Sequence, residues 1–366
     1  MAQLIDLVSD TATQPSAGMR SFMAQALVGD EQRREDPSVN ALQERAAALL
    51  GKEAALYVPS ATMANEIAIT VHTQPSDKII LDETAHIYRA EVGGPAVLSG
   101  VTAYAVTGTR GVFTAEQVEA AIGGKGPHHP WARLVSVEQT SNLGGGTVWP
   151  QERLRAVVDV ARRHGMHTHM DGARLMNAAV ASGILASEHT KGFDSVTLCL
   201  TKGLGCPVGA LVAGDRAFIE EGRRFKHMFG GAMRQAGIIA AAGLYALDHN
   251  IDRLAEDHTN AKILARGLVE IPGINIAVEH VETNIVFFDV AGLGITAKEA
   301  TERMAARGVR MGATGRTRIR AVTHLDVSQA DVERAVEIAQ TVLREGAVSP
   351  VRGQAGRGKA ETPGAG

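Results

Sequence analysis

The chain has 366 residues, and at about 150 residues per domain this length predicts two structural units. Hydrophobic residues make up 45% of the sequence and charged residues 21%, which is typical of a globular protein and excludes a disordered or fibrous chain. The formal charge is −3, from 37 Lys and Arg against 40 Asp and Glu, so there is no overall positive field to attract nucleic acid or anionic lipid.

The N-terminus and the cysteines indicate a cytoplasmic protein. Asp6 and Asp10 stand where a signal peptide would need a basic start and a long apolar run. The most apolar stretch, residues 236–247, is shorter than the roughly 20 residues of a membrane-spanning helix. Cys199 and Cys206 are too few for a disulfide scaffold, and their apolar surroundings suit reduced thiols. We therefore expect a cytoplasmic location and no membrane partner.

Helical patterns alternate with short strand patterns from about residue 39 to residue 214. The strands are AALYV, KIIL, RLVSVE, MHTHM, SVTLCL and GALVAG. This alternation predicts a mostly parallel sheet with helices on both faces. Further along the chain, a long helical pattern, the strand patterns INIAV, NIVFFDV and RTRIRAV, and two more helices predict a smaller α+β domain.

These patterns predict four parts of the chain. Residues 1–14 form an N-terminal segment, and residues 15–247 form a large α/β domain. Residues 248–345 form the small α+β domain. Residues 346–366 contain no Leu, Ile or aromatic residue and are expected to be a flexible tail.

Two polar residues close apolar strands about one strand–helix–strand unit apart. Asp171 ends HTHMD, and Lys202 follows SVTLCLT, so both are expected at the carboxyl edge of the sheet, where ligands bind. A lysine with a lowered pKa can form a Schiff base with an aldehyde, and an aspartate can keep a pyridine nitrogen protonated. These are the minimum needs of a pyridoxal phosphate enzyme. A strand followed by Ser60, Ala61, Thr62 and a helix could supply backbone donors for the phosphate.

Other interpretations of these residues stay open. A lysine after a strand is often a solvated edge residue, and an aspartate before glycine is often a turn former. His167, His169 and Asp171 alternate along one strand and could bind a divalent metal, as in a metal-dependent hydrolase, although no HExxH motif is present. GLGCPVG does not have the dinucleotide-binding spacing. A cofactor-binding protein that has lost its activity is the non-catalytic alternative.

Motifs in a characteristic order give the chain a family resemblance. They are IDLVSDTAT, GDEQRREDPSVNALQ, GKEAALYVPSATMAN, AHIYRAEVGG, HMDGARLMNA, DSVTLCLTKGLGCPVG, FGGAMRQAGIIAAAGLYAL and AVTHLDVS. With these motifs the chain resembles the low-specificity L-threonine aldolases, pyridoxal phosphate enzymes with the aspartate-aminotransferase-like fold, as far as about Arg344.

The resemblance implies how the cofactor is held. Lys202 would bind it covalently, Asp171 would pair with the pyridinium nitrogen, and His86 would stack over the ring. The phosphate would lie at Ala61 and Thr62. Arg174 is also implied among the residues around the cofactor.

The resemblance also implies a substrate site and a reaction. Ser9, Arg174 and Arg320 would hold the substrate carboxylate, so the N-terminal segment, residues 1–14, would contribute to the active site. His86 or His128 would take the proton of the β-hydroxyl group. The implied reaction cleaves L-threonine, L-allo-threonine or related β-hydroxy-α-amino acids to glycine and an aldehyde. A related lyase that performs β-elimination, or one that prefers another β-hydroxy amino acid, is the alternative. The family's usual state is a homotetramer.

Some positions depart from the family pattern. Arg33 lies in a loop where the family has tyrosine and glycine, and Gln139 and Ser141 replace residues of a Glu-Asn-Thr-His-Asn motif. These changes are expected at the rim, where the preference for the β-substituent is set.

Overall fold

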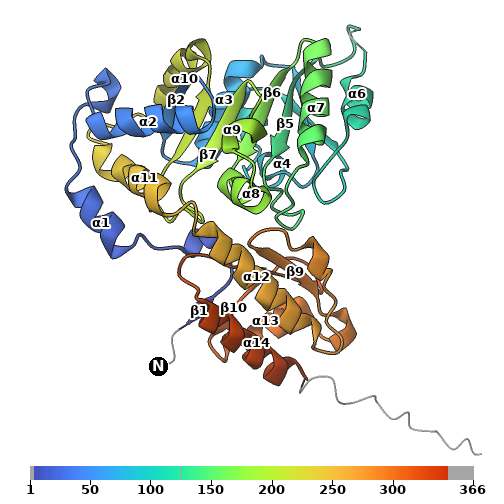
Figure 1. Cartoon of the computed structure of the whole chain (residues 1–366). Coiled ribbons are helices and arrows are strands. Elements are labelled where there is room, and N and C mark those ends of the chain that lie inside the picture. Colours follow the sequence, from blue (N-terminus) through green and yellow to red (C-terminus); the bar gives the residue numbers. More distant parts are fainter. Residues whose placement is uncertain (1–3, 125, 345–366) are drawn as a thin grey trace, which may run out of the picture.

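The computed structural model describes residues 4–124 and 126–344, which form two units (Figure 1). The large unit contains a seven-stranded sheet of order β2-β8-β7-β6-β5-β3-β4, in which β8 runs in the opposite direction to the other six strands. Its strands are β2 (Ala54–Val58), β3 (Lys78–Asp82), β4 (Thr102–Val106), β5 (Ala132–Glu138), β6 (His167–Gly172), β7 (Ser195–Cys199) and β8 (Ala210–Gly214). The predicted mostly parallel sheet is therefore confirmed.

Helices cover both faces of this sheet. One face carries α3 (Ala61–His72), α5 (Gly94–Leu98) and α10 (Arg216–Met228), and the other carries α2 (Pro37–Leu49), α6 (Ala115–Ile122) and α7 (Gln151–Arg163). The remaining helices of the unit are α1 (Ala17–Ala24), α4 (His86–Arg89), α8 (Leu175–Ser182), α9 (Ala186–His189) and α11 (Gly237–His249). Side chains cap the N-termini of several of these helices: Asp36 accepts a hydrogen bond from Val39 N–H at the start of α2, and Ser60 accepts one from Met63 N–H at the start of α3.

The small unit is built from the C-terminal part of the chain and one N-terminal strand. Its sheet has the order β11-β12-β9, all antiparallel, and packs with three helices. These elements are α12 (Leu254–Val269), β9 (Ile285–Asp289), α13 (Ala297–Ala305), β11 (Gly312–Ala313), β12 (Arg318–Val322) and α14 (Gln329–Arg344). β1 (Ile5–Asp6), blue in Figure 1, pairs in parallel with β10 (Val309–Arg310).

Two sequence expectations need adjustment. The INIAV pattern at 274–278 forms no strand and makes only an isolated bridge between Asn275 and Asp289. α11 continues to His249 and α12 starts at Leu254, so a boundary at residue 247 falls inside the last turn of α11. The expected tail, 346–366, lies outside the described residues.

The small residues of α11 have a packing role within this chain. The helix packs against α1 and α2, and a Cβ added at Gly243 would come within 2.8 Å of the Leu42 side chain. Among residues 4–124 and 126–344, no helix combines the length and apolar character needed to cross a membrane.

Candidate active site

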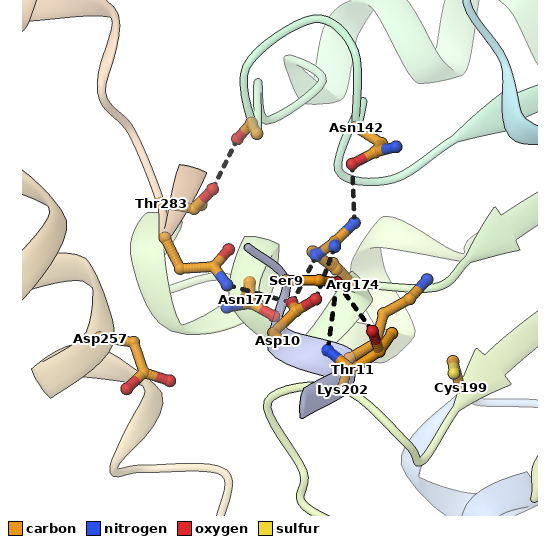
Figure 2. A network of polar contacts seen from close by, with 12 residues as sticks. Ser9, Asp10, Thr11, Asn142, Arg174, Asn177, Cys199, Lys202, Asp257 and Thr283 are labelled. Carbon is orange, nitrogen blue, oxygen red and sulfur yellow. Dashed lines mark hydrogen bonds and ion pairs between the residues drawn. The ribbon is translucent and has the colours of Figure 1, made fainter. Parts of the chain in front are cut away.

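The strand ends bring the predicted residues together at one edge of the large sheet. β5, β6 and β7 run in parallel, so Glu138, Asp171 and the loop that carries Lys202 lie at the same carboxyl edge. A 3-10 turn, η1 (Asp10–Ala12), approaches this edge from the N-terminal segment, and Figure 2 shows it beside Lys202 and Arg174. The site therefore lies where the two units meet.

Lys202 has a fixed backbone and an available amine. Its carbonyl oxygen accepts hydrogen bonds from Thr13 Oγ1 at 3.0 Å and from Gly205 N–H at 2.8 Å. Within the described part of the chain, its Nζ atom has no hydrogen-bond or ion-pair partner, and the residue is half-buried. Its positive charge acts on the site, because it contributes to the lowered pKa of Asp10 and opposes the rise in the pKa of Glu138 that burial causes.

Asp171 is a buried carboxylate in a fixed orientation. Its Oδ1 accepts from Ala173 N–H at 3.0 Å, and its Oδ2 accepts from Asn65 Nδ2 at 3.0 Å. Burial, followed by the charge of Asp171, raises the pKa of the adjacent Glu138 to about 7. A protonated ring nitrogen would be a suitable partner for this concentration of acidic groups.

Asn65 is a site residue that the sequence analysis missed. It lies on α3, and its Nδ2 donates to both Asp171 and Glu91 Oε1, the latter at 2.9 Å. Its Oδ1 bonds with His169 Nε2 at 3.1 Å, and His169 Nδ1 bonds with Ser195 Oγ at 2.9 Å. The position of Asn65, one turn after Ala61 in the helix predicted to bind phosphate, was a usable signal.

These contacts argue against a metal site on β6. Both ring nitrogens of His169 are used by Asn65 and Ser195. His167 lies at the start of the strand with its side chain 52% exposed, and it stacks on His72. The alternative of a metal-dependent hydrolase through His167, His169 and Asp171 is therefore not supported.

A second trio also belongs to the hydrogen-bond network. His86, Glu91 and Asp171 each bring one oxygen or nitrogen atom within 4.8 Å of the others. The Asn65 amide already donates to both carboxylates, and His86 Nδ1 contacts Glu91 Oε1 at 2.8 Å. We therefore assign this trio to hydrogen bonding and not to a metal.

The buried His169 should make stability depend on pH. Burial lowers its folded-state pKa to about 4, against 6.5 in the unfolded chain. The unfolded state therefore takes up a proton first, so its contribution is fully present above pH 6.5 and is lost as the pH falls toward 4. We expect about 3 kcal/mol of unfolding free energy to be lost this way, measured by urea unfolding at several pH values. The His169→Gln variant should lose less stability over the same range, and an unchanged slope would contradict the assignment.

His86 begins α4 and is held by two acidic side chains. Its backbone N–H donates to Glu138 Oε2 at 2.6 Å, and its Nδ1 donates to Glu91 Oε1 at 2.8 Å. The hydrogen bond with Glu91 is the main cause that raises the pKa of His86. The side chain is 36% exposed, so its other ring nitrogen can serve a ligand.

The start of α3 lies at the same edge as Lys202. β2 and β7 are both antiparallel to β8, so β2 also ends at this edge, directly before Ser60 and α3. Ala61 and Thr62 are the first two residues of this helix, and the first N–H groups of a helix have no intrahelical acceptor. They form a suitable place for a phosphate group.

A buried ion pair uses the guanidinium group of Arg174. Its Nε and Nη2 donate to the two carboxylate oxygens of Asp10, both at 2.7 Å, as Figure 2 shows. The side chain of Arg174 is 4% exposed and that of Asp10 is 0% exposed. Nη1 donates to Asn142 Oδ1 at 3.3 Å, so Arg174 is committed to protein partners and holds the N-terminal turn in place.

Arg320 is the arginine better placed to take a substrate carboxylate. It comes from β12 of the small unit, and its Nη1 donates to Asn142 Oδ1 at 3.0 Å. In the described residues no acidic side chain pairs with it, and its buried Nε lacks a partner. Arg320 Nη2 donates to the Val8 carbonyl oxygen at 3.3 Å, so Ser9, the next residue in the chain, lies near Arg320.

His128 is not brought to this site within one chain. It is exposed and lies in the turn before β5, whereas the site lies at the other end of that strand.

The positions that depart from the family pattern differ in burial. Arg33 is exposed on the loop η2 (Glu31–Arg33), but Gln139 is buried, and its side chain binds Trp149 N–H and His189.

Three groups at this edge fit the parts of one cofactor, pyridoxal phosphate. The Lys202 amine suits its aldehyde, the buried Asp171 carboxylate suits its ring nitrogen, and the N-terminus of α3 suits its phosphate. A family profile described as beta-eliminating lyase matches residues 6–291. The low specificity L-threonine aldolase of Escherichia coli K12 is 41% identical over 337 residues, which cover 92% of this chain and 97% of that protein.

The chain belongs to the beta-eliminating lyase family. Within it, the low-specificity L-threonine aldolase 1 of Arabidopsis thaliana is 39% identical over 344 residues, covering 93% of this chain and 96% of that protein. The crystal structure of a putative L-allo-threonine aldolase from Listeria monocytogenes has a TM-score of 0.78 at 21% identity and covers 93% of this chain and 96% of that one. This likeness confirms the predicted fold class for this lyase.

Proposed function

We propose that this lyase cleaves L-threonine, L-allo-threonine and related β-hydroxy-α-amino acids to glycine and an aldehyde, with pyridoxal phosphate as cofactor. The observation that carries the proposal is the meeting of Lys202, Asp171 and the start of α3 at one sheet edge, to which Arg320 is linked through Asn142 and Glu138. Identities of 39% and 41% with proteins named as threonine aldolases support it.

The chain's own residues would hold and orient the reactants. Pyridoxal phosphate, when bound, supplies an electron sink for negative charge at the substrate α-carbon. Lys202 would hold it through Nζ, Asp171 would keep its ring nitrogen protonated, and the N–H groups of Ala61 and Thr62 would bind its phosphate. Arg320 would orient the substrate by its carboxylate.

His86 is the candidate base within the chain. Its Nδ1 donates to Glu91, which fixes the proton on that nitrogen and leaves Nε2 to accept the proton of the β-hydroxyl group. His86 would thus combine contact with the cofactor and proton transfer.

The test is product analysis of the purified full-length protein supplied with pyridoxal phosphate. We expect glycine and acetaldehyde in equal amounts from L-threonine and L-allo-threonine. Release of pyruvate or another keto acid with ammonia would instead indicate β-elimination, and the absence of any product would indicate a protein that has lost activity. A panel with aromatic and acidic β-substituents would define the substrate range.

Replacing Arg320 by alanine should weaken substrate binding. A hydrogen bond to a charged group contributes about 1.5–3 kcal/mol, so KM should rise roughly 10- to 100-fold. Steady-state kinetics on L-threonine test this, with Arg316→Ala, an exposed residue two positions before β12, as the control. A KM equal to that of the control would contradict the role of Arg320.

We also propose a cytoplasmic homotetramer in which His128 of one subunit approaches a neighbouring site. Apolar side chains that are at least 69% exposed support assembly: Leu27, Val92, Val97, Leu185 and Met228. The two free, buried cysteines are consistent with a reducing compartment. Light scattering of the purified protein would measure the number of subunits.

The proposed reaction would consume threonine and supply glycine.

A further inference from the structure

Glu66 is a buried acidic residue that the mechanism above does not use. It lies on α3, directly after Asn65, and is 2% exposed. A Cβ added at Gly94 would come within 2.1 Å of its Oε1, so the backbone of Gly94 covers one side of the carboxyl group. In the described residues neither oxygen has a hydrogen-bond donor.

Among the described residues, the group that acts on Glu66 is another carboxyl group. Glu91, which is 5% exposed, interacts with the Glu66 side chain at hydrogen-bonding range, and its Oε2, like both oxygens of Glu66, is buried without a donor. Two ionised carboxylates in contact and out of water repel each other strongly, so such a pair shares one proton. When one proton lies between two buried carboxyl groups, one group donates a hydrogen bond and the other accepts it, so neither group is left without a partner.

The hydrogen bonds show which member carries the proton. Glu91 Oε1 accepts from Asn65 Nδ2 at 2.9 Å and from His86 Nδ1 at 2.8 Å, and these donors stabilise its negative charge. Glu91 Oε2 has no donor of this kind. Glu66 receives no donor on either oxygen, which favours its neutral form and makes it the donor in the pair.

We propose that Glu66 is a positioning residue that stays protonated and donates its proton to Glu91, so that the Glu91 carboxylate holds His86 Nδ1. Glu91 then remains a single negative charge in a fixed orientation. His86 is kept with its proton on Nδ1 and with Nε2 toward the reacting groups. The role of His86 rests on the proposed function, whereas the protonation of Glu66 does not.

The surrounding charges set the pH at which this arrangement fails. Burial and the neighbouring Glu91 raise the pKa of Glu66 to about 8. Asp171 on β6 acts on Glu91 and also favours a proton in the pair, while His86 on α4 and the Asn65 amide stabilise the charge of Glu91. Lys202 acts on His86 from the loop after β7. Above pH 8 Glu66 ionises, and Glu91 loses its donor.

Infrared spectroscopy of the full-length protein tests the protonation directly, with and without added pyridoxal phosphate. We expect a carbonyl band of neutral carboxylic acid at pH 7. The buried Glu138, whose pKa is raised to about 7, also contributes to this band, so the readout is the difference between the wild type and Glu66→Gln. The part of the band that Glu66→Gln lacks should disappear from the wild type as the pH rises through about 8. The whole band should be unchanged in Glu119→Gln, a control on α6 with a side chain 48% exposed. If Glu66→Gln shows the same band as the wild type at pH 7, the proposal is wrong.

Kinetics then test the positioning role. Glu66→Leu removes the donor to Glu91, and kcat/KM at pH 7 should fall about tenfold, the size expected for one lost hydrogen bond to a buried charge. Glu66→Gln should restore most of this loss, because its amide can donate to Glu91, and it should lack the decline of the wild-type enzyme above pH 8. A glutamine variant as impaired as the leucine variant would overturn the proposal. If Glu66→Leu does not fold, the infrared band and the pH profile of Glu66→Gln decide.

Failure of the proposed function would look different. A protein that shows the titrating band but releases no glycine from any substrate retains the Glu66–Glu91 pair and lacks only the proposed activity.

Discussion

Replacement of Lys202 by alanine is expected to abolish both covalent cofactor binding and turnover. The amine has no hydrogen-bond or ion-pair partner among the described residues, whereas its backbone is fixed by Thr13 and Gly205. Loss of a nucleophile from a catalytic unit lowers kcat by about 10⁴-fold or more. The measurements are the visible absorbance of the protein supplied with pyridoxal phosphate and the rate of glycine release.

Two further variants separate covalent chemistry from charge and from general damage. Lys202→Arg keeps the positive charge but cannot form the covalent link, so it should be as inactive as the alanine variant. Lys191→Ala removes a lysine that is 68% exposed and paired with Glu188, and it should behave like the wild type. Substantial turnover in Lys202→Ala would refute the assignment of the site.

Replacement of Asp10 by alanine is expected to cause the largest loss of stability. Asp10 accepts two hydrogen bonds from Arg174, and its third donor is Asn284 Nδ2 at 3.1 Å. The positive charge of Arg174 and these donors hold the pKa of Asp10 well below its usual range despite its burial. The variant would leave a buried guanidinium group without a counter-charge, which costs about 3–5 kcal/mol of unfolding free energy.

The control is an aspartate–arginine pair on the surface. Asp248 contacts Arg45 with side chains 42% and 47% exposed, so Asp248→Ala should cost about 1 kcal/mol or less. Adding Arg174→Met to Asp10→Ala should recover part of the loss, because the unpaired charge is then removed. Denaturant unfolding measures all three variants, and equal losses in Asp10→Ala and Asp248→Ala would show that the inner pair does not carry the stability assigned to it.

Local patterns were sufficient to predict that the proposed cofactor residues lie at one edge of the sheet. Asp171 and Lys202 each follow an apolar run of strand residues, and parallel strands present their carboxyl ends at one edge. The start of α3 was equally readable, because Ser60 caps a helix that directly follows a strand. The small domain was less readable: the INIAV run has the composition of a strand, but in the fold only Asn275 makes a bridge.

The partners of the charged residues were decided by the tertiary structure. Arg174 is predicted to bind substrate, and only the fold shows that it is paired with Asp10, 164 positions away in sequence, whereas Arg320 has no acidic partner among the described residues. Asn65 and Glu66 looked like ordinary helix residues until β6 and the turn before α5 brought Asp171 and Glu91 against them. Strand and helix periodicity is a property of neighbouring residues and can be read from the chain. Ion pairs and shared protons depend on burial and on distances between remote segments, which exist only after folding.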